Sequence, residues 1–212
     1  MIKKANATNR EDNVSAVQKA YKTIKTNISL SLLKEGCKRI VVTSASPREG
    51  KSTTAVNIAI SFAQESKRVL IVDCDLKKPK IHKAFGISDQ PGLTNVVSDQ
   101  ATLETAISET RYANLYCLPA GLIVPNPSEI LANERFFSIL DELEEQFDYI
   151  IFDTPPLNIV SDALPVMKLA DGVILIVRSK ISLYSEFEKA LSNIENANAK
   201  LLGVIVNGET NE

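Results

Sequence analysis

One segment of the chain has the composition needed to hold phosphate groups. Residues 39–43 form an apolar run of strand length, and a helical pattern begins at residue 53. The loop between them, residues 44–53, reads SASPREGKST. Backbone N–H groups of such a loop can surround phosphate oxygens, and the following helix N-terminus adds positive potential. Lys51 would reach the outer phosphates, and the Ser52 hydroxyl would bind Mg²⁺. We therefore predict that ATP and Mg²⁺ bind here, with nucleotide contacts from Ser46, Pro47, Arg48, Glu49, Gly50, Lys51, Ser52 and Thr53.

The tripeptide Gly50-Lys51-Ser52 is not decisive by itself, because the strict pattern G-x-x-x-x-G-K-[ST] begins with glycine where this chain has Ala45. A lysine that is merely solvated near a helix N-terminus is the alternative. The position of the loop directly after the first predicted strand favours phosphate binding.

Three aspartates lie where predicted strands end. Asp73 and Asp75 follow residues 68–72, and Asp153 follows residues 149–152. Side chains two apart in a strand point to one face, and ligands of open α/β sheets gather at the carboxyl ends of the strands. One carboxylate of the first pair can hold Mg²⁺ while the other accepts a proton. We assign Ser52, Asp73 and Asp153 to the metal and Asp75 to base catalysis, although polar residues also end strands without any function.

A basic run follows the paired carboxylates. Lys77 can neutralise charge on a transferred phosphoryl group, so we predict Lys51 and Lys77 as catalytic with Asp75. A solvated loop explains Lys77 equally well and is the better account of the other lysines. His82, which has no partner cluster in the sequence, is expected at the surface. Asn207 ends the last predicted strand, where its amide can contact adenine or form a turn before Gly208.

Alternating strands and helices must position these residues. Strand-like runs cover residues 39–43, 68–72, 114–118, 149–152, 172–177 and 201–206. Helical patterns cover residues 53–64, 127–146, 162–170 and 183–196. Strands apolar on both faces with helical crossovers predict an α/β fold, with a mainly parallel central sheet and helices on both faces.

An extra N-terminal helix is predicted from an apolar stripe at spacings of three and four. Its members are Val14, Val17, Tyr21, Ile24, Ile28 and Leu32. We interpret the stripe as core packing rather than as a docking face. The chain is then a single domain of residues 1–212, with an N-terminal helical segment at 1–36 and a nucleotide-binding core at 37–208.

Composition excludes several classes of protein. The 212 residues carry a net charge of −2, without the basic surplus of a protein that coats nucleic acid. Three cysteines without metal-ligand spacing favour a reducing cytoplasm over a disulfide framework. No apolar run approaches the roughly 18 residues of a membrane span, so we expect membrane association only through a partner.

These motifs resemble those of the bacterial tyrosine kinases of capsule and exopolysaccharide synthesis, a P-loop family unrelated to eukaryotic protein kinases. The family's phosphate loop matches residues 47–53, its D-x-D motif matches residues 71–77 with Lys77 replacing the usual arginine, and its Walker B strand matches residues 150–156. Segments 118–131 and 21–27 are also similar, so the resemblance covers nearly the whole chain. It implies a P-loop NTPase fold that transfers the γ-phosphate of ATP to tyrosine hydroxyls.

The resemblance also implies the site roles and the partners. Lys51 would contact phosphates, Ser52 and Asp153 would hold Mg²⁺, Asp73 would be a further carboxylate near the metal, and Asp75 would deprotonate tyrosine. In such kinases made as separate cytoplasmic polypeptides, the cytoplasmic tail of a transmembrane polysaccharide co-polymerase or adaptor completes the ATP site. We expect the same here, with recruitment to the inner face of the membrane and with tyrosine-bearing proteins as substrates.

Two departures from the family pattern concern assembly and substrate. A glutamate and two arginines that join subunits in a ring are replaced by Lys19, Lys22 and Lys25, so a homo-oligomer would not use the usual contact. A terminal tyrosine cluster is absent from residues 207–212. The acceptor tyrosines are therefore expected on other chains.

Two other functions fit the phosphate loop. A switch ATPase of the MinD/ParA type would carry a second lysine where this chain has Ser46, and often a membrane-targeting C-terminal helix. A non-catalytic, nucleotide-sensing adaptor of a polysaccharide-assembly membrane protein would keep its biological output without Asp75.

Overall fold

The computed structural model describes residues 2–159 and 162–208, with side chains from residue 16 onward. Seven strands form one sheet in the order β3-β4-β2-β5-β1-β6-β7, and every neighbouring pair is parallel except β3 and β4. The elements are α1 (Ile2–Ser31), β1 (Lys38–Ser44), α2 (Lys51–Ala63), β2 (Val69–Asp73), α3 (Ile81–Phe85), α4 (Leu93–Val97), α5 (Leu103–Ala106), β3 (Ser108–Glu109), β4 (Leu115–Leu118), α6 (Pro127–Leu131), α7 (Glu134–Glu144), β5 (Tyr149–Asp153), α8 (Ala163–Leu169), β6 (Gly172–Arg178), α9 (Tyr184–Asn196) and β7 (Leu201–Asn207).

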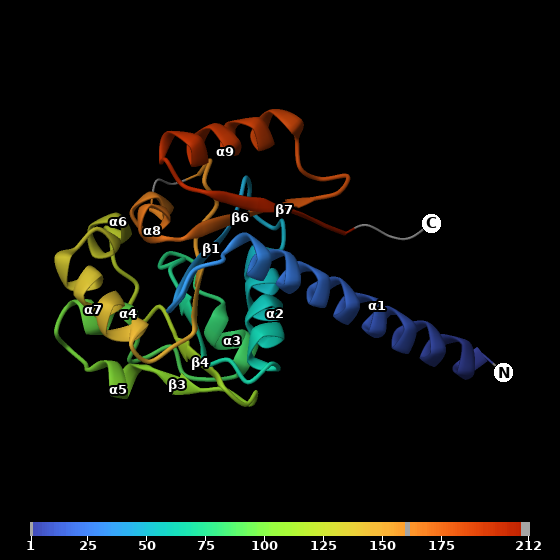
Figure 1. The fold of residues 1–212 in the computed structure, drawn as a ribbon, viewed down its shortest axis with the longest axis horizontal. Coiled ribbons are helices and arrows are strands. Elements are labelled where there is room, and N and C mark those ends of the chain that lie inside the picture. Colours follow the sequence, from blue (N-terminus) through green and yellow to red (C-terminus); the bar gives the residue numbers. More distant parts are fainter. Residues whose placement is uncertain (1, 160–161, 209–212) are drawn as a thin grey trace.

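Helices cover both faces of the sheet (Figure 1). The end of α1 packs with α2 and α3 on one face, around Ile28, Ile58 and Phe62. Helices α4 to α9 pack on the other face, where α7 contributes Phe136 and Ile139. Strands β1, β2 and β5 are apolar because both of their faces are covered. This architecture confirms the predicted α/β fold.

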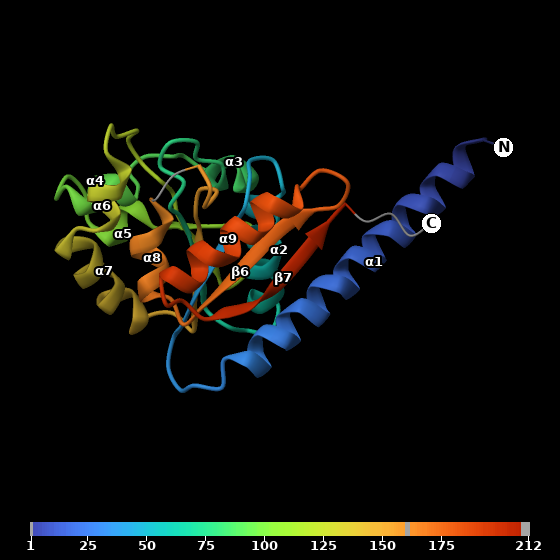
Figure 2. The same cartoon turned by 90° about the horizontal axis from the view of Figure 1, so that it is seen from above.

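The register of the central strands sets where the chemistry lies. Asp73 at the end of β2 pairs with Asp153 at the end of β5, and β5 in turn lies beside β1. The phosphate loop begins where β1 ends, at Ser44. Since parallel strands end at a common edge, all three segments meet there. The loops that follow β4 and β6 lie along the same edge (Figure 2).

Only part of the N-terminal stripe packs into the core. Ile28 and Leu32 are buried, whereas Val17 is 52% exposed, and the side chain of Val14 lies outside the described side chains. Helix α1 extends past the sheet (Figure 2). The interpretation as core packing therefore holds for the last turns of α1 and is wrong at Val17.

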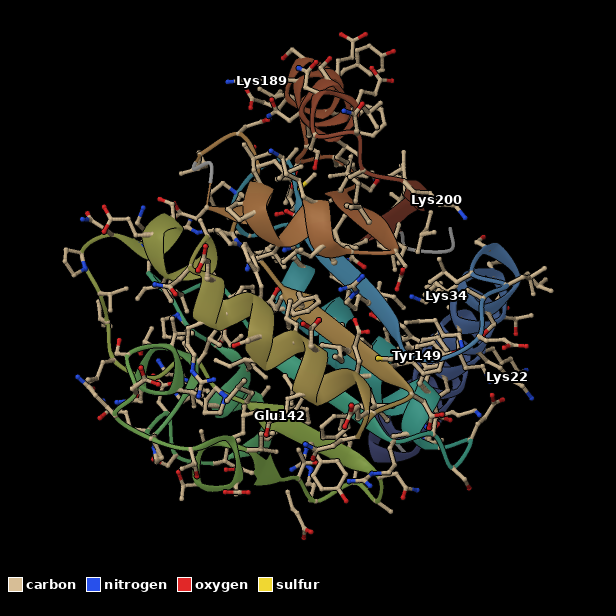
Figure 3. The ribbon with its side chains drawn as sticks, turned by 60° about the vertical axis from the view of Figure 1, so that its left-hand side comes forward. Lys22, Lys34, Glu142, Tyr149, Lys189 and Lys200 are labelled. Atoms are coloured by element: carbon tan, nitrogen blue, oxygen red, sulfur yellow. The ribbon has the colours of Figure 1, made fainter. Side chains whose placement is uncertain are left out.

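Polar contacts fasten the end of α1 to the domain. Lys34 Nζ lies 2.7 Å from Asp171 Oδ1, and Lys200 Nζ donates to the Ser31 carbonyl at 2.7 Å. Figure 3 shows Lys34 and Lys200 on the same side of the molecule, where α1 ends. Lys25 is buried and ion-pairs with Glu65 of the same chain. The charge of Lys25 is thus neutralised within the chain. Lys22, in contrast, is exposed on the outer side of α1 (Figure 3).

The prediction of one helix over residues 127–146 is wrong. Helix α6 ends at Leu131 and α7 begins at Glu134. The side chain of Asn133 caps α7 by accepting from Arg135 N at 2.8 Å, and its extended backbone interrupts the helical path. The short elements α3, α4, α5 and β3 were not predicted, because two to five residues contain too little periodicity.

Strand β7 differs from the central strands because it lies at the sheet edge. Leu201, Val204 and Val206 are 39–48% exposed, so the expectation of strands covered on both faces is wrong here. Within the described residues, no helix is both long and apolar enough to cross a bilayer.

Candidate nucleotide and metal site

The phosphate loop joins β1 directly to α2, as the sequence predicts. Gly50 precedes α2 with a φ of 96°, a left-handed conformation that glycine adopts without strain. A Cβ atom at Gly50 would lie 2.6 Å from Asn207 Nδ2, so close packing also requires glycine. The first turn of α2 then places Lys51 and Ser52 beneath the loop.

Hydrogen bonds within the loop and from β7 hold its shape. Glu49 is buried; its Oε2 accepts from Ser46 N at 2.8 Å, and its Oε1 accepts from the Ser182 hydroxyl. Asn207 Nδ2 donates to the Glu49 carbonyl at 3.0 Å and to Thr54 Oγ1 at 3.1 Å. The loop is therefore braced from β7 and from the segment between β6 and α9.

Four charged side chains meet at the end of the sheet. Lys51 Nζ lies 2.9 Å from Asp75 Oδ2 and 3.3 Å from Asp153 Oδ1. Asp73 is held by backbone donors, since its Oδ2 accepts from Lys80 N at 2.8 Å and from Ile81 N at 2.9 Å. All four side chains are buried, so three carboxylates face one ammonium group.

This excess of carboxylates shifts the proton affinities. Burial, and next the charge of Asp153, raises the pKa of Asp73 from 3.8 to about 7. Burial also raises the pKa of Asp153. For Lys51, burial acts to lower the pKa, but the Asp153 and Asp75 carboxylates outweigh it and raise the pKa. Lys51 therefore stays protonated and positively charged, and the excess of carboxylates favours the binding of a further cation.

The donor set fits a divalent cation. Asp153 Oδ2 is buried and has no hydrogen-bond partner among the described residues. A buried carboxylate oxygen of this kind is costly unless a cation or donor reaches it. The Ser52 hydroxyl lies 3.4 Å from Lys51 Nζ, on the same side of the loop as the carboxylates. Oxygen ligands are those that Mg²⁺ prefers, so the Ser52 hydroxyl and Asp153 Oδ2 fit the predicted role. Both oxygens of Asp73 accept backbone hydrogen bonds, and the described residues contain no group of three or more His, Cys, Asp or Glu side chains arranged as a metal site.

Other predicted residues lie less centrally. Pro47, Arg48 and Thr53 are exposed, so their side chains do not belong to the buried cluster. Lys77 Nζ lies 3.0 Å from Asp162 Oδ2. The Nδ1 atom of His82 lies 3.1 Å from Asp89 Oδ1, and the His82 side chain is only 13% exposed, so the surface prediction is wrong in degree.

Four residues of this region were missed by sequence reasoning: Thr54, Asp162, Arg178 and Ser182. Thr54 accepts a hydrogen bond from Asn207, and the Ser182 hydroxyl donates to the Glu49 side chain. Arg178 Nη1 donates to the Arg48 carbonyl at 3.3 Å. Asp162 is the first residue of the helical segment predicted over residues 162–170, where an aspartate normally indicates a cap rather than a partner for Lys77. Only their positions after strand ends or in the first turn of a helix could have indicated them.

Comparisons with known proteins agree with this geometry. Residues 37–202 match the AAA domain family. The tyrosine-protein kinase YwqD of Bacillus subtilis (strain 168) is 39% identical over 189 residues, which cover 89% of this chain and 80% of the relative. The crystal structure of the chimeric protein CapA2B2 superposes with a TM-score of 0.84 at 35% identity, covering 88% of this chain and 82% of the other.

The fold is also shared more widely. The cell-division ATPase MinD of Pyrococcus furiosus superposes with a TM-score of 0.68 at 24% identity, covering 82% of this chain and 74% of MinD. Identity that low shows a common fold only, whereas the higher identity and coverage above show family membership. The chain belongs to the family of bacterial tyrosine-protein kinases built on the AAA-type P-loop fold.

Proposed function

We propose that this chain is an ATP-dependent protein-tyrosine kinase that regulates capsular or extracellular polysaccharide synthesis. The observation that carries the proposal is the contact of Lys51 with both Asp75 and Asp153. Lys51, Asp75 and Asp153, for which we propose the roles of phosphate ligand, base and metal ligand, lie in one buried cluster. The names of its relatives as tyrosine-protein kinases support the same reaction.

Nucleotide binding exchanges the partners of Lys51. Lys51 is the first residue of α2 and directly follows the phosphate loop. Phosphate oxygens bound in that loop would compete with the carboxylates for the Lys51 ammonium. Ser52 and Asp153, with Asp73 as a further carboxylate nearby, would hold Mg²⁺, which would supply positive charge to the phosphates of the nucleotide. Among the chain's own residues, Ser46 to Thr53 would hold the phosphates, and Asn207 would lie near the base.

Asp75 is suited to accept the tyrosine proton once Lys51 has turned to the phosphates. Its Oδ2 is then released, while its Oδ1 still accepts from Lys78 N at 3.2 Å. That bond fixes the carboxylate without protonating it. Positioning of the hydroxyl and neutralisation of the phosphoryl group, to which Lys77 contributes, supply the remaining catalysis.

A membrane-protein partner is proposed on the strength of an apolar surface beside the loop. Ile181, Leu183 and Tyr184 are 57–73% exposed and flank Ser182, which binds the Glu49 side chain. The cytoplasmic tail of a polysaccharide co-polymerase or adaptor, seated there, would complete the ATP site and recruit the chain to the inner face of the membrane. The CapA2B2 chimera, a structural neighbour, is consistent with such a pairing.

The kinase reaction is tested by incubating the chain with Mg·ATP and a tyrosine-bearing peptide, with and without the partner tail. Mass spectrometry should find phosphotyrosine, and Asp75→Asn should reduce the rate by at least about 100-fold while it still binds ATP. Asp141→Asn, an exposed position on α7, is the matched control. ATP hydrolysis without phosphotyrosine would instead identify a switch ATPase, and unchanged output from Asp75→Asn would identify an adaptor.

The partner surface has a separate test. Leu183→Ser should abolish the gain in ATP affinity that the tail provides. Leu33→Ser, at an 85% exposed position beyond α1, should leave that gain intact. An ATP affinity that the tail does not change would contradict the proposed partner.

A further inference from the structure

An ion pair outside the cluster links two loops of the active edge. Lys77 Nζ lies 3.0 Å from Asp162 Oδ2. Lys77 follows Asp75 by two residues after β2, and Asp162 lies in the segment between β5 and α8. Since β2 and β5 are neighbours with Asp73 opposite Asp153, the pair spans the same strands as the carboxylate cluster.

The two partners differ in burial. The Asp162 side chain is 6% exposed, whereas that of Lys77 is 44% exposed. Asp162 precedes α8 but makes no side-chain cap hydrogen bond, and Lys77 is its one polar partner among the described side chains. Burying a carboxylate to this extent costs free energy unless a cation pairs with it. The surroundings of Asp162 are therefore suited to hold a cation.

Lys77 is the member of its basic run that is held in place. Lys78, Lys80 and Lys83 are exposed, and their ammonium groups contact no carboxylate among the described residues. A free lysine side chain loses rotamer entropy when it is fixed. Asp162 has already restricted the Lys77 side chain before a substrate arrives, so less entropy is lost when Lys77 meets a phosphate.

We infer that Asp162 is a positioning residue that orients Lys77 toward the terminal phosphate of ATP. The inference rests on the proposed function, because it assigns a support to a residue of that reaction. In this proposal Asp162 acts through Lys77, because it holds the ammonium on the loop that follows Asp75, near the place where charge would develop on the phosphoryl group.

The experiment compares Lys77→Met, Asp162→Asn and the double variant, with Lys83→Met, at an exposed position of the same basic run, as the control. Two quantities are measured: the affinity ratio between a non-hydrolysable Mg·ATP analogue and Mg·ADP, and kcat and KM for phosphotyrosine formation. Each single variant should lower the affinity ratio and kcat by about tenfold with little change in the peptide KM, and the double variant should lower them no further. Lys77→Arg should retain both, and Lys83→Met should match the parent.

The affinity ratio keeps this inference separate from the kinase assignment. If the parent chain forms no phosphotyrosine, the proposed function fails, while the ratio still tests whether Asp162 orients Lys77. An Asp162→Asn chain that keeps the parent ratio would overturn the inference even if kinase activity is found. Should Asp162→Asn unfold, Asp162→Ser provides the same test, because serine can cap α8 without pairing with Lys77.

Discussion

Replacement of Asp73 by asparagine should change how stability depends on pH. In the folded chain burial raises the pKa of Asp73 from 3.8 to about 7. Between these values the folded state keeps a proton that the unfolded chain has lost. The free energy of unfolding therefore falls as pH rises from about 4 to about 7, by at most about 4 kcal/mol.

Asparagine removes this titration but also one hydrogen bond. Its single carbonyl oxygen can keep the bonds from Lys80 N and Ile81 N, while the bond from Asp75 N at 3.2 Å is lost. That loss costs about 1–3 kcal/mol at all pH values. Asp73→Asn is thus expected to be less stable than the parent near pH 4 and more stable above pH 7.

Urea unfolding at a series of pH values, without divalent cations, measures both effects. The difference in unfolding free energy between the parent and Asp73→Asn should change sign across the window. Asp141→Asn, exposed on α7, should differ from the parent by the same small amount throughout. A difference between the parent and Asp73→Asn that stays constant from pH 4 to pH 8 would refute the reasoning, since Asp73 would then titrate alike in both states.

Three further substitutions test the site and the core. Lys51→Met should weaken Mg·ATP binding by about 100-fold in calorimetry, because the phosphates lose a charged donor; binding within about threefold of the parent would contradict this role. Gly50→Ala should destabilise the fold by about 1–3 kcal/mol in urea unfolding, because its φ is 96° and the new methyl group would meet Asn207; an unchanged midpoint would show that the loop relaxes freely. Phe136→Ala, at a fully buried position of α7, should cost about 3–5 kcal/mol in the same assay, and a loss below about 1 kcal/mol would mean that the cavity collapses.

The site was predictable where residue type and strand position act together. Gly50, Lys51 and Ser52 lie between a strand and a helix, and Asp73, Asp75 and Asp153 end neighbouring strands. Short apolar runs and period-3.6 patterns predict those elements within a few residues. Parallel pairing then brings their carboxyl ends to one edge, whatever the order of the strands.

Contacts between distant segments were not predictable in this way. Nothing local to Ser182 indicates that its hydroxyl reaches Glu49, and the pairing of Lys77 with Asp162 joins two loops through the packing of α8. Asn133 shows the limit for helices: its capping bond interrupts an otherwise continuous amphipathic pattern, because a favourable side-chain cap competes with helix continuation.

The bond from Asn207 to the phosphate loop has a consequence for synthesis of the chain. Asn207 follows Thr54 by 153 residues, so the loop leaves the ribosome long before its brace exists. At roughly 5–20 residues per second the interval is about 8–30 s. During that time β1 and α2 can form, but Asn207 is not yet present to fix the Glu49 carbonyl. The phosphate loop therefore acquires its final shape late, after β7 has joined the sheet.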